Sequence, residues 1–106
     1  MMPNEIEQQR YMTRNIADKV DLLIQIYLWE LIDERKRQGE EVDYFQIFEL
    51  SVEEQDGKAT QKIVHRQEEP EYSCEHYLHC ISEPITCKIW VIDSGEYWTM
   101  LFPEEY

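Results

Sequence analysis

LLIQIYLWELI, residues 22–32, is an apolar stretch that only Gln25 and Glu30 interrupt. Apolar residues in and around it recur at intervals of three and four, which places them on one face of an α-helix. The residues on this face are Val20, Ile24, Leu28 and Leu31, and Leu23, Tyr27 and Ile32 widen it. A helix this apolar is expected to be buried over most of its circumference.

The helix is expected to run from about residue 20 to about residue 38. Asp18 or Asp21 can cap its N-terminus, where negative charge is favoured. The basic run RKR, residues 35–37, falls in the last turn, where cations suit the helix dipole, and Gly39 ends the helix.

Six strands are expected, one before this helix and five after it. Turn signals at Asp56-Gly57, Glu83-Pro84 and Ser94-Gly95 join the later strands. The expected strands are residues 11–16, 44–53, 58–67, 76–81, 86–93 and 97–102. Since hairpins pair strands antiparallel, the sequence predicts an α+β fold in the order β-α-β-β-β-β-β. One main helix is expected to pack on an antiparallel, strongly curled sheet of about five or six strands.

Two hairpin turns also predict which residues pair across strands. The Asp56-Gly57 loop places Leu50 opposite Ile63, Phe48 opposite His65 and Val52 opposite Gln61. The Ser94-Gly95 loop places Val91 opposite Trp98, Ile89 opposite Met100 and Trp90 opposite Thr99. Apolar residues then remain on the side that one helix cannot cover: Phe45, Ile47, Trp90 and Ile92. Either the sheet closes on itself or a second chain covers them, and a homodimer is the simpler explanation.

Composition limits the classes of partner. The chain of 106 residues has 23 acidic and 10 basic residues, a formal net charge of −13. Direct nucleic-acid binding needs clustered Lys and Arg for the phosphates, and an anionic membrane would repel this chain. Electrostatics therefore favour a basic protein or a cation as partner.

Length and termini predict one folded unit. Residues 1–9 are polar and expected to be disordered, and residues 10–106 are expected to form a single α+β domain. The N-terminus lacks the apolar segment of a secretory signal, and no apolar run reaches membrane-spanning length. Three cysteines are an odd number, without the paired framework of a small secreted domain. We therefore expect a cytoplasmic protein.

Five segments together resemble a known family: YMTRNI (11–16), LWELID (28–33), DYFQIFEL (43–50), QKIVHRQEEPEY (61–72) and KIWVIDSGEYWTMLFPEEY (88–106). Chains of this kind form the uncharacterised domain-of-unknown-function family 960, found in staphylococci, related Gram-positive bacteria and their phages. The resemblance covers most of the chain beyond residue 10. It implies a small cytoplasmic bacterial or phage protein, and it supplies no activity and no site residues.

Cysteine and histidine residues cluster late in the chain, at Cys74, His76, His79, Cys80 and Cys87. Thiolate and imidazole bind zinc, and a Glu83-Pro84 turn would set Cys80 opposite Cys87. Against a zinc site, the spacing lacks the paired knuckles of known sites, and free cysteine is a common buried residue. The sequence therefore leaves two interpretations of Cys74, His76, Cys80 and Cys87: they are zinc ligands, or they are ordinary strand residues. We assign no metal or cofactor.

No catalytic residue is assigned either. His65 is expected inside, opposite Phe48, and Arg66 outside, so these two and the nearby Glu68 and Glu69 do not converge on one pocket. Trp29 is the one candidate partner contact, because it lies in the otherwise polar helix row of Asp21, Gln25 and Asp33. The alternative is that Trp29 packs beneath a neighbouring loop.

Three functions fit these patterns. The first is a small acidic cytoplasmic protein-interaction or regulatory module of a Gram-positive bacterium or its phage, without enzymatic activity. The second is an acidic mimic of DNA that inhibits a nucleic-acid-binding protein, and it predicts carboxylates crowded on one face. The third is an enzyme of unidentified chemistry, and it predicts a pocket with a perturbed histidine or carboxylate.

Overall fold

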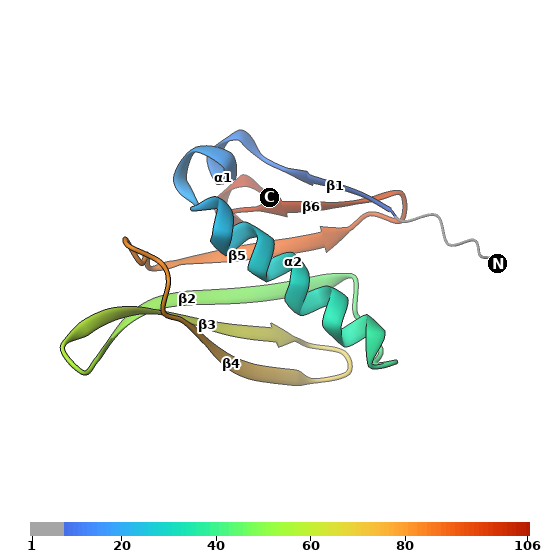
Figure 1. Cartoon of the computed structure of the whole chain (residues 1–106). Coiled ribbons are helices and arrows are strands. Elements are labelled where there is room, and N and C mark those ends of the chain that lie inside the picture. The colour runs from blue at the N-terminus through green and yellow to red at the C-terminus, as the bar shows by residue number, and fades with distance from the viewer. Residues whose placement is uncertain (1–7) are drawn as a thin grey trace.

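A six-stranded sheet with one long helix crossing it diagonally makes up most of the molecule (Figure 1). This computed structural model describes residues 8–106. The elements are β1 Gln9–Met12, α1 Arg14–Lys19, α2 Leu22–Arg37, β2 Phe45–Gln55, β3 Lys58–Gln67, β4 Tyr72–Leu78, β5 Cys87–Asp93, β6 Tyr97–Leu101 and the short 3-10 helix η1 Pro103–Glu105. We expected residues 1–9 to be disordered. Residues 1–7 lie outside the described part of the chain, and β1 begins at Gln9.

The expected α+β class with one main helix is confirmed, but the expected sheet is wrong in two respects. The sheet is not strongly curled, and it is mixed, because β1 pairs parallel with β6. The other neighbouring pairs in the order β1-β6-β5-β2-β3-β4 are antiparallel. Hairpin turns impose antiparallel pairing only on the strands that they join. β1 is joined to β6 by no turn, so its direction was not constrained.

The β2–β3 hairpin has the predicted register. Phe48 pairs with His65, Leu50 with Ile63 and Val52 with Gln61. Asp56 and Gly57 both have positive φ, at 51° and 78°, as the tight two-residue hairpin turn requires.

The β5–β6 hairpin is shifted by two residues from the predicted register. Val91 pairs with Met100 rather than with Trp98, because the backbone N–H of Ser94 donates to the carbonyl of Tyr97 and lengthens the loop. A shift of two leaves every side chain on its expected face, since side chains alternate with a period of two. Val91, Trp98 and Met100 are accordingly all buried.

β4 and β5 do not form the predicted hairpin at Glu83-Pro84. β4 begins at Tyr72, four residues earlier than expected, and pairs with β3, whereas β5 pairs with β2. Residues 79–86 instead cross over from one edge to the middle of the sheet, and Ile81 anchors them in the core. The buried Gln61 amide holds the crossover at Ile85, accepting from its N–H (2.8 Å) and donating to its carbonyl (2.9 Å).

The segment 11–16, expected as a strand, divides between two elements. β1 ends at Met12, and the Thr13 hydroxyl caps α1 by accepting from the N–H of Ile16. The long helix follows the sequence more closely. Asp21 caps α2 by accepting from the N–H of Leu23, and Gly39 ends it with a φ of 77°.

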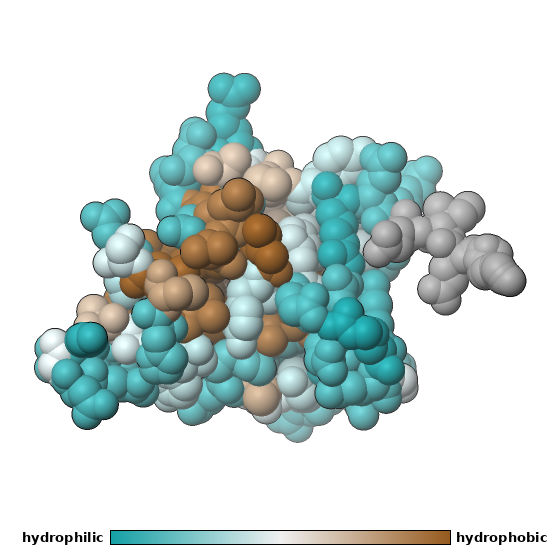
Figure 2. Space-filling view, in the orientation of Figure 1, coloured by the Kyte–Doolittle hydropathy of each residue, from teal (hydrophilic) through white to brown (hydrophobic). Residues whose placement is uncertain are grey.

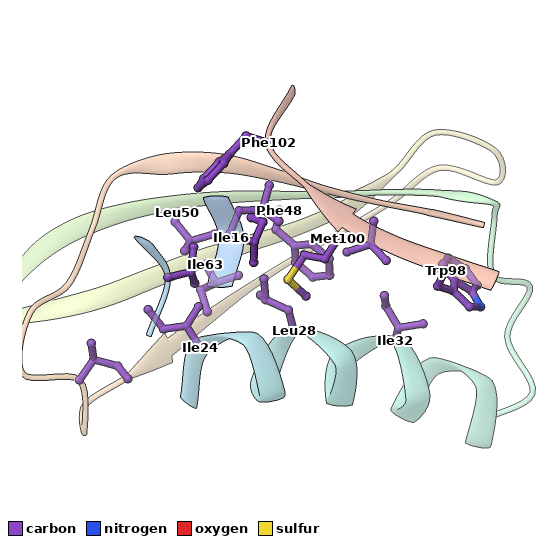
Figure 3. Packing of buried hydrophobic residues seen from close by; sticks show 14 residues of the cluster. Ile16, Ile24, Leu28, Ile32, Phe48, Leu50, Ile63, Trp98, Met100 and Phe102 are labelled. Carbon is purple, nitrogen blue, oxygen red and sulfur yellow. The ribbon is translucent and has the colours of Figure 1, made fainter. Parts of the chain in front are cut away.

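The core lies between α2 and the inner face of the sheet. Figure 3 shows Ile24, Leu28 and Ile32 pointing from the helix toward the sheet. The buried cluster comprises Ile16, Val20, Ile24, Leu28, Ile32, Phe48, Leu50, Ile63, Ile81, Ile89, Val91, Trp98, Met100 and Phe102. Contrary to the expectation that most of the circumference of this helix is buried, Leu22, Leu23 and Ile26 of α2 are exposed. One sheet covers one side of a helix, and the described chain places nothing over the other side.

We predict that Gln61→Leu lowers the free energy of unfolding by about 2–4 kcal/mol, because it leaves the N–H and carbonyl of Ile85 without their partner. Urea denaturation followed by circular dichroism measures this loss. Gln55→Leu, the same change at a half-buried position near the β2–β3 turn, is the control and should change stability by less than about 0.5 kcal/mol. Equal losses in the two variants would contradict the role of Gln61.

Candidate functional site

The late cysteine and histidine residues do not meet in one place. Cys74 and His76 lie on β4, His79 and Cys80 are exposed in the crossover, and Cys87 lies on β5 beside β2. The expectation that Cys80 faces Cys87 is wrong, since β4 and β5 are not neighbours. Among residues 8–106, no three His, Cys, Asp or Glu side chains are grouped so that they could hold a metal ion. Burial raises the pKa of the Cys87 thiol to about 11, which leaves it a poor nucleophile.

Cys74 and His76 belong to the layer between β4 and the helix. The Nδ1 atom of His76 lies 3.5 Å from the Tyr27 hydroxyl of α2, and burial lowers the pKa of His76. The Arg35 guanidinium of α2 stacks on the Tyr72 ring at 3.5 Å. These contacts fasten the edge strand β4 to the helix.

His65 is a core residue, as the register predicted. Its ring stacks on Phe48, with centroids 4.5 Å apart, and its Nε2 lies 2.6 Å from the side-chain oxygen of Gln46. The Gln46 amide nitrogen already donates to Asp43 and Gln67, so its oxygen accepts and Nε2 of His65 carries the proton. Burial, followed by the nearby His76 and Arg35, lowers the pKa of His65 from 6.5 to about 3.

The groups near His65 in the sequence point elsewhere. Arg66 lies on the outer face of the sheet and pairs with Glu49 at 3.4 Å. Glu68 and Glu69 are exposed in the turn that follows β3. His65, Arg66 and these carboxylates therefore do not form an acid–base site.

We predict that His65 makes the fold sensitive to mild acid. Its folded pKa lies below its unfolded value, so its contribution is complete above pH 6.5 and is lost as the pH falls toward 3. This loss amounts to roughly 2 kcal/mol by about pH 5. Urea denaturation between about pH 7 and about pH 5 should show a shallower pH dependence for His65→Gln than for the wild type.

His79→Gln is the matched control, because His79 is exposed. It should keep the pH dependence of the wild type. The same slope in His65→Gln and the wild type would contradict the buried, neutral state of His65.

The described residues form three surface cavities that could hold a substrate. The largest, about 560 Å³, is lined by Lys19, Cys87, Lys88 and Glu104 among others, and none of the three is lined by a histidine. The Glu105 carboxylate borders the smallest, but it accepts from the Phe102 N–H, Thr13 and Asn15. These hydrogen bonds lower the pKa of Glu105. Those from Thr13 and Asn15 tie the C-terminal segment to the start of α1. The histidines of the described residues therefore lie outside all three cavities.

Trp29 is half-buried rather than bare. The Arg10 guanidinium of β1 lies 4.8 Å from the centre of its ring and is held there by a bidentate pair with Asp33. Gln25 in the same row is buried, and donates to the carbonyl of Val20 at 2.8 Å. Gln25, Trp29 and Asp33 of this row therefore face β1 and α1, whereas Asp21 is exposed, and a partner contact at Trp29 stays a prediction.

An exposed aliphatic surface, which the sequence did not predict, lies on the side of α2 that faces away from the core. Leu22, Leu23 and Ile26 are 63%, 53% and 55% exposed, and we name them the helix patch. Figure 2 shows hydrophobic residues gathered over the first half of α2 and the neighbouring crossover. The acidic residues nearest to the patch in sequence are Asp18, Asp21 and Glu30, all exposed. This arrangement suits contact with an apolar protein surface that carries positive charge.

The family model for a staphylococcal protein of unknown function (DUF960) matches residues 9–105. The chain belongs to this family. The resemblance found in the sequence is thereby confirmed, and the family's description carries no function.

One solved structure shares the fold of this family member. It is a protein of unknown function from Enterococcus faecalis, with a TM-score of 0.75 and 20% sequence identity, over 93% of this chain and 91% of that chain. A search of curated proteins gave no match. Within residues 8–106, no helix is long and apolar enough to cross a membrane.

Proposed function

We propose that this chain is a small acidic protein-interaction or regulatory module of a Gram-positive bacterium or its phage, and that it acts in the cytoplasm without catalysis. The observation that carries the proposal is the helix patch. Leu22, Leu23 and Ile26 expose aliphatic surface on a rigid helix whose other side is fixed in the core. A monomer gains nothing from such surface, and contiguous exposed apolar residues are typical of binding sites.

A basic protein is the partner that the charges favour. Asp18, Asp21 and Glu30 are exposed and are the acidic residues nearest to the patch in sequence, and the chain as a whole carries −13. Acidic groups at the rim of an apolar contact select a partner with Lys or Arg around its own apolar surface and speed the encounter. Binding of this kind weakens with salt, because exposed charges are screened.

The arrangement of acids gives the DNA-mimic function less support. Such a mimic needs carboxylates crowded on one face. Acidic residues here occupy α2, the β3–β4 turn and the C-terminal segment, and those on the outer sheet face are matched by bases. An interaction site at the helix patch accounts for more of the observed surface.

Affinity capture from a Gram-positive cell lysate, with quantitative mass spectrometry, tests the function. We expect the double variant Leu22→Ser/Ile26→Ser to lose at least about tenfold of the captured partner, since it removes two apolar contacts. Its stability should change little, because both side chains are exposed. Raising the salt from about 50 to about 300 mM should also reduce capture by the wild type.

Val52→Ser is the matched control, because Val52 is an exposed aliphatic residue near the end of β2. It should capture the partner as the wild type does. Identical captured proteins for the control and the double variant would show that the helix patch does not bind them.

A further inference from the structure

The outer face of the sheet, opposite α2, carries a row of touching aromatic rings. Tyr44, Phe45, Trp90 and Tyr106 follow one another with centroid distances of 6.1, 4.9 and 5.7 Å, and we name them the aromatic strip. Tyr44 and Tyr106 are 60% and 82% exposed. The strip is thus an accessible ridge on a face that α2 does not cover.

A hollow lies beside this ridge on the same face. It is a cavity of about 270 Å³ lined by Ile92, Tyr97, Leu101 and Tyr106, with Ser94, Thr99 and Glu105 as its polar residues. In a dimer with two-fold symmetry, the same surface patch of both copies forms the interface. The ridge of each copy can then fit into the hollow of the other, which gives two equivalent contacts. A projecting ring next to an apolar hollow is the shape that such pairing requires.

Charge on the outer face distinguishes it from the rest of the molecule. The outward positions of the strands carry three acids and four bases, and Glu105 at the border of the hollow is a fourth acid. These residues are Glu49, Glu53, Glu75, Glu105, Lys58, Lys62, Arg66 and Lys88. Lys62 lies 3.0 Å from Glu53 and 3.7 Å from Glu75, and Arg66 pairs with Glu49. Residues 8–106 hold 21 acids and 10 bases, so the whole excess of 11 negative charges in the described part of the chain lies off this face.

We infer that the outer sheet face binds the same face of a second copy of this chain. Two chains of charge −13 repel through most of their surfaces, and a face of zero net charge is where they can approach. A basic partner finds no excess negative charge there, whereas the helix patch has exposed acidic residues near it in sequence. The aromatic strip then supplies the apolar centre of a sheet-on-sheet contact.

Light scattering coupled to size-exclusion chromatography, and sedimentation over a range of concentrations, test this inference on the full chain. The wild type should have twice the mass of the 13.0 kDa chain. Tyr44→Glu/Tyr106→Glu, which adds acid to the neutral face, should raise the dissociation constant about 100-fold or more. Higher salt should strengthen the dimer, because it screens the repulsion between the chains.

Leu22→Glu/Ile26→Glu is the matched control, with the same number of charges added to the helix patch. It should leave the dimer intact while it abolishes capture of a partner from lysate, so the two proposals fail independently. Circular dichroism checks that the variants fold, and Tyr106→Ser, a change at the exposed C-terminal residue, is the milder second variant.

A wild-type mass of 13.0 kDa up to about 200 µM would overturn the inference. A dimer that resists the tyrosine variants, or one that the control disrupts, would equally overturn it by placing the interface on another surface.

Discussion

The contact of one helix row with one sheet face is the constraint on which the rest of the structure depends. Ile24, Leu28 and Ile32 are fully buried against the inward residues of the strands. Fully burying a large aliphatic side chain stabilises a fold by about 1.5–3 kcal/mol, so this row is a major part of the stability of a small domain. Because there is one helix for one sheet, the same packing leaves two surfaces uncovered: the far side of α2 and the far side of the sheet.

Buried glutamines connect the irregular segments to this layered core. Gln67 accepts from the Asp43 N–H and from Gln46, and it donates to the carbonyls of Glu41 and Pro70. It thereby ties the link between α2 and β2 to the turn after β3. Gln61 does the same for the crossover that precedes β5. Side-chain amides supply a donor and an acceptor, and so satisfy loop backbone that has no strand to pair with.

Local signals in the sequence predicted local structure well. Asp56-Gly57 predicted the β2–β3 register, and Gly39 predicted the end of α2. The sequence left the N-cap of α2 open between Asp18 and Asp21, and Asp21 is the cap. Pairings between distant segments were beyond such signals. No turn joins β2 to β5, and the crossover before β5 is anchored by Ile81 and by the amide of Gln61, which are not local turn signals. Trp29 and Gln25 were placed in a polar stripe because periodicity does not show that Arg10 and the end of α1 cover that row. The helix patch was missed for a related reason, since periodicity does not reveal how many sides of a helix are packed.

A pair of matched substitutions in α2 tests this account most directly. Leu28 is fully buried and Leu22 is 63% exposed, and both are leucines of the same helix. Urea denaturation should show that Leu28→Ala lowers the free energy of unfolding by about 3–5 kcal/mol, through lost burial and the cavity that remains. Leu22→Ala should change it by less than about 0.5 kcal/mol. Similar losses in the two variants would contradict the one-sided packing of the helix, and with it the exposed helix patch.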